Sequence, residues 1–159
     1  MHNAEYSPTK PRYGERRISD KEYDELRKHT PSRKIRQKVN ENNVIGADDP
    51  AIPGKKIEGS LEADHIVSMD KIAKMENFDN LSTENQIKVL NYEENFTGLS
   101  KSANTSKGAK SYSEWTTYKK ENIPISMEYK AEMMKKESAL EPVLQGMIDG
   151  LLKEQGVKS

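Results

Sequence analysis

The chain has no cysteine, only two phenylalanines and one tryptophan, and no net charge. Without cysteine it can form neither disulfide bonds nor zinc sites that use thiolate ligands. It has no apolar run that approaches the length of a membrane span, and residues 1–20 are too polar to be a cleavable signal peptide. If the protein is exported, a segment outside this sequence must direct it.

Apolar residues are also scarce. They make up 33% of the 159 residues, against a usual fraction of about 45–50%. Charged residues make up another 33% with both signs interspersed, which favours helices with solvated faces over disorder. We therefore expect a modest core with helical extensions, and a stability that depends in part on a partner.

The two signs of charge are unevenly distributed along the chain. Residues 1–39 carry eleven Lys and Arg against six Asp and Glu, whereas residues 40–97 carry five against twelve. Residues 98–120 carry five against one, which is the local positive surplus that phosphate contact requires. The acidic middle suits a cation or a basic partner, although a solvated surface is the simpler explanation for most of its carboxylates.

Turn residues and helix caps divide the chain into four regions. Residues 1–17, which hold two prolines and scattered charges, predict a flexible arm or linker. Residues 18–60 predict a helical extension followed by a loop, residues 61–121 a core, and residues 122–159 a C-terminal helical extension. We expect residues 18–159 to form one domain.

Caps and periodicity predict the elements within these regions. Ser19 and Glu22 form a capping-box pattern, and Ser111 and Glu114 repeat it. The predicted helices cover residues 20–29, 31–41 with Pro31 first, 69–77 with Ser68 as its cap, a stretch capped by Ser82, Ser111 through Lys120, and 126–155. Residues 95–100 predict a strand, and Asn104 falls on a short helical turn after it.

The stretch Leu61-Glu62-Ala63-Asp64-His65-Ile66-Val67-Ser68 holds the best candidate for chemistry. His65 is suited to deprotonate a water near neutral pH. Asp64 points to the opposite side of an extended backbone, so that one strand can offer a base and a hard oxygen ligand. Asn104 offers a second, neutral oxygen ligand. Two protein oxygens leave water positions free, which suits Mg²⁺, with Mn²⁺ as an alternative; without a second histidine ligand, Zn²⁺ and Ni²⁺ are less favoured.

Each of these residues also has a simpler interpretation. An Asp-His pair occurs by chance in many chains. Asn104 alone could cap a helix, and Asn95 could form a turn. Only Asp64, His65, Asn95 and Asn104 together, in this order and on plausible elements, favour a catalytic site.

These four residues carry a family resemblance. Their order resembles the ββα-metal (His-Me finger) fold of HNH nucleases, and Asn95-Phe96-Thr97-Gly98-Leu99-Ser100-Lys101-Ser102-Ala103-Asn104 looks like the second strand and metal helix of that fold. RNA-guided HNH domains and phage endonuclease VII have similar sequences there. Residues 23–115 look closer still to nuclease toxin domains of bacterial polymorphic toxins, in particular the LXG toxins exported by type VII secretion.

The resemblance implies a role for each matching residue. It implies His65 as general base and Asp64 and Asn104 as ligands of one divalent ion. Asn95 matches the middle Asn, which helps to hold the loop and orient the base-bearing strand, and Asn91 is a competing candidate. The lysines implied to contact phosphate are Lys107, supported by Lys101 and Lys110. The departure from HNH proper is Asn104 in place of His, which bears on the identity of the metal more than on activity.

The resemblance also implies a fold and a function. The expected fold is α+β and mostly helical, with a ββα-metal core at residues 61–121 between helical extensions. The expected function is a Mg²⁺-dependent endonuclease that cuts DNA with little sequence specificity, as a toxin delivered into the cytoplasm of target bacteria and neutralised by an immunity protein. A delivery module would lie upstream if the chain is a fragment. The alternatives are a ribonuclease, a phage-defence or DNA-processing nuclease, and a catalytically silent nucleic-acid-binding module.

Overall fold

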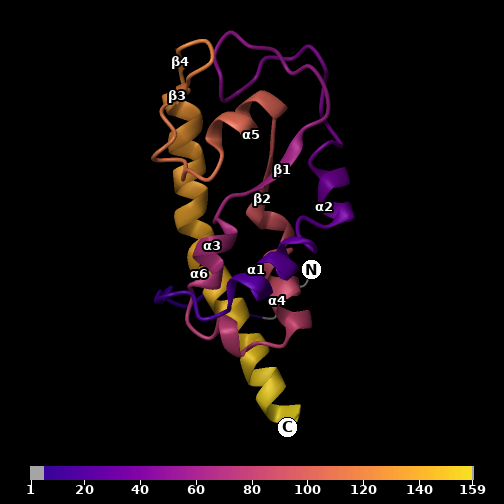
Figure 1. The fold of residues 1–159 in the computed structure, drawn as a ribbon, viewed down its shortest axis with the longest axis vertical. Coiled ribbons are helices and arrows are strands. Elements are labelled where there is room, and N and C mark those ends of the chain that lie inside the picture. Colours follow the sequence, from indigo (N-terminus) through magenta and orange to yellow (C-terminus); the bar gives the residue numbers. More distant parts are fainter. Residues whose placement is uncertain (1–5, 159) are drawn as a thin grey trace. The chain divides into compact units, whose positions relative to one another are not determined.

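The structure is a computed structural model that describes residues 6–158. Residues 1–5 of the expected arm and Ser159 of the expected C-terminal extension lie outside it. The described chain has an α+β fold with six α-helices and two small antiparallel sheets, which confirms the expected fold class (Figure 1). Within these residues no helix is both long enough and apolar enough to cross a membrane.

The chain divides into two compact units that each combine distant parts of the sequence. Unit 1 holds the described residues up to Ser32, Val67–Asn95, and the described residues from Ser138 onward. Unit 2 holds Arg33–Ile66 and Phe96–Glu137. Each unit has its own hydrophobic core.

Unit 1 is built from helices. They are α1 (Asp20–Arg27), α3 (Met69–Ala73), α4 (Thr83–Leu90), the later part of α6 (Met127–Lys158), and the short 3₁₀ helices η2 (Phe78–Asn80) and η3 (Glu93–Asn95). Val67, Ile72, Phe78, Leu144 and Ile148 are fully buried in its core. The unit thus packs the helices that follow β1 in the chain against the C-terminal helix.

Serine caps start the three α-helices that begin in unit 1, as the sequence predicts. Ser19 and Glu22 form the complete capping box of α1, with bonds of 2.9 and 3.1 Å. The hydroxyls of Ser68 and Ser82 accept hydrogen bonds from backbone amides in the first turns of α3 and α4. These bonds satisfy amide groups that a helix start leaves without partners.

The described part of the expected arm is held against unit 1 by hydrogen bonds. The Thr9 amide donates to the Pro142 carbonyl at 3.1 Å, and the Arg12 amide donates to Gln145 Oε1 at 2.9 Å. The Arg12 guanidinium also pairs with Asp149 at 2.8 Å. A Cβ at Gly146 would lie 2.1 Å from the carbonyl oxygen of Ser7, so the close approach of this stretch to α6 requires glycine there.

Unit 2 contains both small sheets. Its elements are α2 (Arg33–Lys38), β1 (Glu62–His65), β2 (Phe96–Leu99), α5 (Lys101–Lys107), β3 (Thr117–Tyr118), β4 (Ile123–Pro124) and the first part of α6. In the first sheet β1 pairs antiparallel with β2, with Asp64 opposite Thr97 and His65 opposite Phe96 (Figure 1). Aromatic side chains fill much of the core; they include Tyr112, Trp115, Tyr118 and Tyr129.

Helix α2 is shorter than expected. It begins at Arg33, so Pro31 does not occupy its first position, and it ends at Lys38. Asn40, which was expected inside the helix, lies beyond its end. Its side chain accepts a hydrogen bond from the Leu61 amide at 2.7 Å and donates one to the Leu61 carbonyl at 3.0 Å. These two bonds fix the chain just before β1, and they depend on a residue that local propensity cannot anticipate.

The helix expected from Ser111 through Lys120 is not formed. Ser111 and Glu114 do make the expected reciprocal bonds, at 2.9 and 3.3 Å, but the chain then turns and enters β3. The β-branched residues Thr116 and Thr117 favour an extended backbone. The indole of Trp115 also donates to Ser106 Oγ at 2.9 Å, which holds this segment against α5.

Candidate functional site

Asp64 lies in a polar cluster with two buried partners. The Tyr112 hydroxyl donates a hydrogen bond to Asp64 Oδ2 at 2.8 Å, and Lys107 Nζ lies 3.3 Å from the same oxygen. The Lys107 ammonium also lies 4.5 Å from the centre of the Tyr112 ring. Since the exposed fractions of the Lys107 and Asp64 side chains are only 7% and 17%, this ion pair is largely shielded from water.

Asn104 is tied to the same face of β1. Its side-chain amide donates to Glu62 Oε1. Glu62 and Asp64 are two positions apart on the strand, so their side chains leave on the same side of the sheet. Helix α5 therefore contacts this face twice, through Asn104 and through Lys107.

His65 is the last residue of β1. Its ring packs against Phe96, its cross-strand partner in β2, with 4.3 Å between the ring centres. As the next residue along the strand, it projects from the face opposite to that of Asp64. The side chain is half-buried, so water can reach the imidazole.

The two candidate middle asparagines hold different segments of unit 1. Asn95 is fully buried; its Oδ1 accepts from the Val67 amide at 2.8 Å, and its Nδ2 donates to the Val67 carbonyl at 3.0 Å. Asn91 accepts from the Ser32 amide at 3.1 Å and donates to the His29 carbonyl at 2.8 Å. Asn95 thus fixes the backbone two positions after His65, whereas Asn91 fixes the loop before α2.

Burial alters the acid–base behaviour of two tyrosines in unit 2. Burial, reinforced by the nearby Asp64 carboxylate, raises the pKa of Tyr112 far above its ordinary value. Its hydroxyl therefore stays protonated and can donate to Asp64 across the physiological pH range. Burial likewise raises the pKa of Tyr129 to about 12. The Tyr129 hydroxyl is buried and lies near Thr97 and Tyr112, although it makes no hydrogen bond of normal geometry with any described residue.

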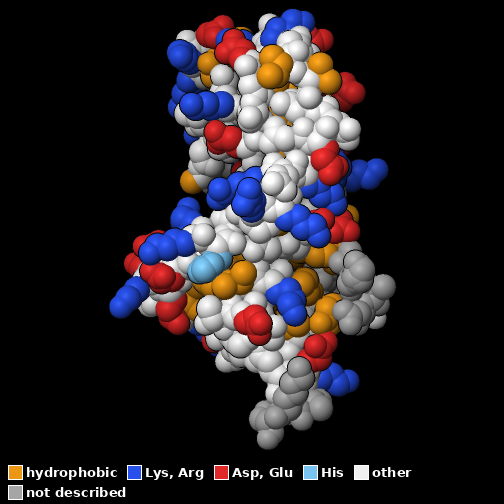
Figure 2. Space-filling model, turned by 90° about the vertical axis from the view of Figure 1, so that its right-hand side faces the viewer, with side chains coloured by type: hydrophobic (Ala, Val, Ile, Leu, Met, Phe, Trp, Pro, Cys, Tyr) orange, Lys and Arg blue, Asp and Glu red, His pale blue; other side chains and the backbone are white. Residues whose placement is uncertain are grey.

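The three lysines expected to contact phosphate have different surroundings. Lys107 is buried and paired with Asp64, whereas Lys101 and Lys110 are exposed. Figure 2 shows Lys, Arg, Asp and Glu side chains interspersed over the face drawn, in keeping with the zero net charge. In this arrangement Lys107 fixes the position of Asp64, and the two exposed lysines are the ones that solvent and ligands can reach.

The donor set of this cluster matches the preferences of Mg²⁺. Asp64 Oδ1 and Asn104 Oδ1 accept no hydrogen bond from any described residue, and both are hard oxygen donors. No group of three His, Asp or Glu side chains gathers in the described part of the chain. An ion held by Asp64 and Asn104 would therefore keep several waters, as Mg²⁺ commonly does.

Sequence reasoning missed two members of this cluster and one pairing within it. Glu62 shares a strand face with Asp64, and the alternation of side chains along a strand could have identified it. Tyr112 is 48 positions from Asp64, and no local signal relates the two residues. The pairing of Lys107 with Asp64 was likewise not expected, because a lysine beside a phosphate-binding motif is normally exposed.

No protein-family model, curated protein or solved structure matches the chain.

Proposed function

We propose that unit 2 carries the active site of a Mg²⁺-dependent endonuclease that cleaves DNA with little sequence specificity. The observation that carries the proposal is the double attachment of α5 to one face of β1. Lys107 bonds Asp64, and Asn104 bonds Glu62, on one face of the strand, and His65 ends the same strand and projects from its other face. This β1–β2–α5 arrangement supports a ββα-metal core.

Each residue has a defined part in the proposed reaction. His65 removes a proton from the attacking water, because an imidazole changes its protonation state near neutral pH. Asp64 and Asn104 hold the divalent ion, which would neutralise charge on the scissile phosphate. Lys107 and Tyr112 are positioning residues that orient the Asp64 carboxylate. Asn95 is a positioning residue for the backbone that follows β1.

The proposal extends to a biological role. The resemblance to LXG toxin domains supports a toxin that is delivered into the cytoplasm of target bacteria. A producing cell would then need an immunity protein that covers the active site or the lysine-rich segment around residues 101–120. The surplus of positive charge in that segment supports an acidic surface on the immunity protein.

Cleavage of plasmid DNA and of RNA tests the proposed activity. We expect DNA cutting with Mg²⁺, and loss of cutting both with EDTA and in the variant His65→Ala. His29→Ala is the matched control, because it removes an exposed imidazole in unit 1 and should leave cutting unchanged.

Three outcomes would contradict parts of the proposal. Persistent cutting by His65→Ala protein would exclude His65 as the base. Cutting of RNA alone would make the enzyme a ribonuclease. If neither nucleic acid is cut with any divalent ion, the protein is a binding module without catalytic activity.

A further inference from the structure

A pocket of about 400 Å³ lies on the side of α5 away from β1. Lys101, Ser102, Thr105 and Ser106 of α5 line it, whereas Asn104 and Lys107 of the same helix bond to β1. At 100° per residue, positions 101, 102, 105 and 106 form one face of the helix, and positions 104 and 107 lie on the other. The pocket is thus distinct from the cluster around Asp64.

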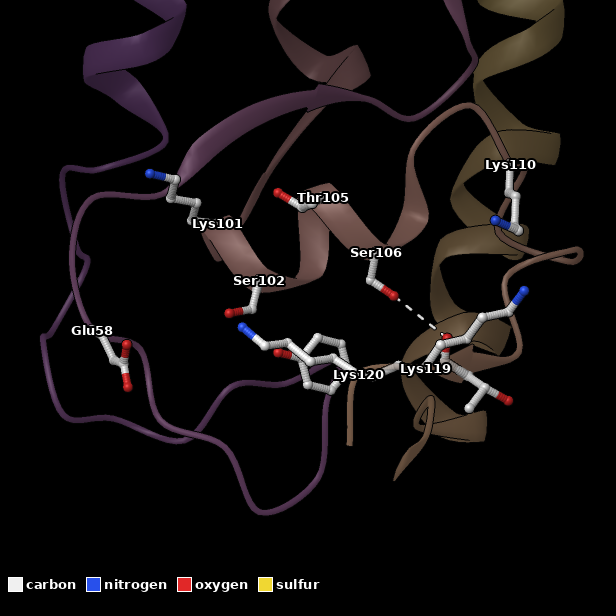
Figure 3. Close-up of a pocket in the computed structure, with 10 residues that line it drawn as sticks. Glu58, Lys101, Ser102, Thr105, Ser106, Lys110, Lys119 and Lys120 are labelled. Carbon is white, nitrogen blue, oxygen red and sulfur yellow. Dashed lines mark hydrogen bonds between the residues drawn. The ribbon is translucent and has the colours of Figure 1, made fainter. Parts of the chain in front are cut away.

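Four lysines are among the residues that line this pocket, and their ammonium groups point in different directions around it (Figure 3). Lys101 comes from α5, Lys110 from the segment after it, and Lys119 and Lys120 from the turn that follows β3 (Figure 3). Glu58 is the single carboxylate among the residues that line the pocket. Four ammonium groups against one carboxylate give the pocket a strong positive potential.

These four lysines have no ion-pair partner among the described residues, in contrast to other lysines of unit 2. Lys55 pairs with Glu121 at 2.6 Å, so the acidic residue that follows Lys120 is already engaged. Lys56 pairs with Asp48, and Lys107 pairs with Asp64. Glu114 lies near enough to Lys110 to attract it, but the like charges of the four lysines still repel one another, and an anionic ligand would relieve that repulsion.

We propose that this pocket binds a backbone phosphate of the nucleic-acid substrate, away from the phosphate that is cut. The inference rests on the proposed function, because it takes the cluster around Asp64 as the point of cleavage. The ammonium groups supply charge, and the hydroxyls of Ser102 and Thr105 supply hydrogen-bond donors to phosphate oxygens. The contact carries no sequence information, in keeping with cleavage of low specificity.

A second pocket connects this site with the cluster around Asp64. It has a volume of about 330 Å³ and shares Glu58, Lys101 and Ser102 with the lysine pocket. Glu62, which accepts a hydrogen bond from Asn104, also lines it. A helix is about 10 Å thick, so the bound phosphate would lie within a few nucleotides of the cleavage point.

Binding of a labelled oligonucleotide, measured by fluorescence anisotropy in EDTA, tests this inference without any need for cleavage. The test variant is Lys119→Ala/Lys120→Ala, because both side chains are exposed and unpaired among the described residues. Each phosphate contact contributes a slope of about 0.7–0.9 to the dependence of log affinity on log salt, or about a tenfold affinity difference between ~0.1 M and 1 M salt. We expect the variant to bind at least about tenfold more weakly at ~0.1 M salt, with a slope lower by about one.

Two matched variants complete the design. Lys135→Ala/Lys136→Ala removes the same charge from exposed positions of α6 that do not line the pocket, and should bind as the unmodified protein does. Lys119→Arg/Lys120→Arg keeps the charge and should retain affinity. Circular dichroism checks that every variant is folded.

Each outcome separates the pocket from the active site. Unchanged affinity and salt slope in Lys119→Ala/Lys120→Ala, or an equal loss in the α6 variant, overturns the inference while the nuclease proposal can still hold. Loss confined to the pocket variant supports the inference even if the protein cuts no substrate. A protein that binds neither DNA nor RNA oligonucleotides overturns the inference.

Discussion

Replacing Lys107 by methionine should destabilise unit 2 strongly. Methionine keeps the apolar stem but removes the charge, so Asp64 loses the ammonium 3.3 Å from its Oδ2. Removing one member of a buried ion pair costs about 3–5 kcal/mol. Asp64 is 17% exposed and keeps its hydrogen bond from Tyr112, so the lower end applies. We expect the free energy of unfolding to fall by about 3 kcal/mol.

Denaturation by urea measures this change. Trp115 is the only tryptophan of the chain and is 1% exposed in the core of unit 2, so its fluorescence reports on that unit. Lys110→Met is the control, because the same substitution at an exposed lysine should change stability by less than about 0.5 kcal/mol. The double variant Asp64→Asn/Lys107→Met should lose less stability than the sum of its single variants, because they disrupt the same interaction.

The Lys107→Met variant also tests whether the Asp64–Lys107 ion pair is purely structural or lies beside a metal site. Without the Lys107 ammonium, the Asp64 carboxylate should bind a divalent cation more tightly, and Mg²⁺ should raise the melting temperature of Lys107→Met protein more than that of the unmodified protein. A Lys107→Met loss no larger than that of Lys110→Met would refute the argument from burial. An equal Mg²⁺ effect in both proteins would refute Asp64 as a ligand.

Two further substitutions test the packing around the first sheet and the buried tyrosines. In Gly98→Ala the new Cβ would lie 2.8 Å from Leu61 Cδ1, so we expect a loss of about 1–3 kcal/mol in urea denaturation, whereas Gly59→Ala, with open space around it, should be neutral. Burial raises the pKa of Tyr129 to about 12, so the folded state retains a proton that the unfolded state releases above roughly pH 10; this stability is complete below that pH and is lost as pH rises to about 12. Tyr129→Phe should therefore make the alkaline loss shallower, by up to about 1.4 kcal/mol per pH unit, without destabilising the protein at neutral pH; an unchanged alkaline slope would contradict this reasoning.

Features that depend on local bonds could be predicted from the sequence. The caps at Ser19, Ser68 and Ser82 involve atoms three residues apart, and the expected helices do begin at those positions. The strand over residues 96–99 and the helix that carries Asn104 also follow from local pattern. Asn95, which was expected to begin that strand, instead ends the 3₁₀ helix η3 one residue before it, where its side chain bonds Val67.

Features that depend on distant bonds could not be predicted. Helix α2 ends at Lys38, and Asn40 then bonds Leu61, which is 21 residues away. Helix propensity is a local property and gives no information about so distant a partner. The expected helix after Ser111 gives way to β3 because three aromatic side chains of that segment are buried in the core of unit 2. The division into two units, each assembled from separate stretches of sequence, also arises from packing that no single segment specifies.

The positive surplus of residues 98–120 shows how the fold changes the meaning of a charge count. The segment holds five lysines and one glutamate. From the sequence alone, these lysines are expected to form one basic surface. Lys107 instead neutralises Asp64, a carboxylate from the acidic middle of the chain, on the β1 side of α5. The other four lysines line the pocket on the opposite side, where Glu58 from that same acidic middle joins them. Helix α5 therefore separates a lysine that orients a carboxylate from lysines that a ligand can reach, and only the second group should determine the salt dependence of binding.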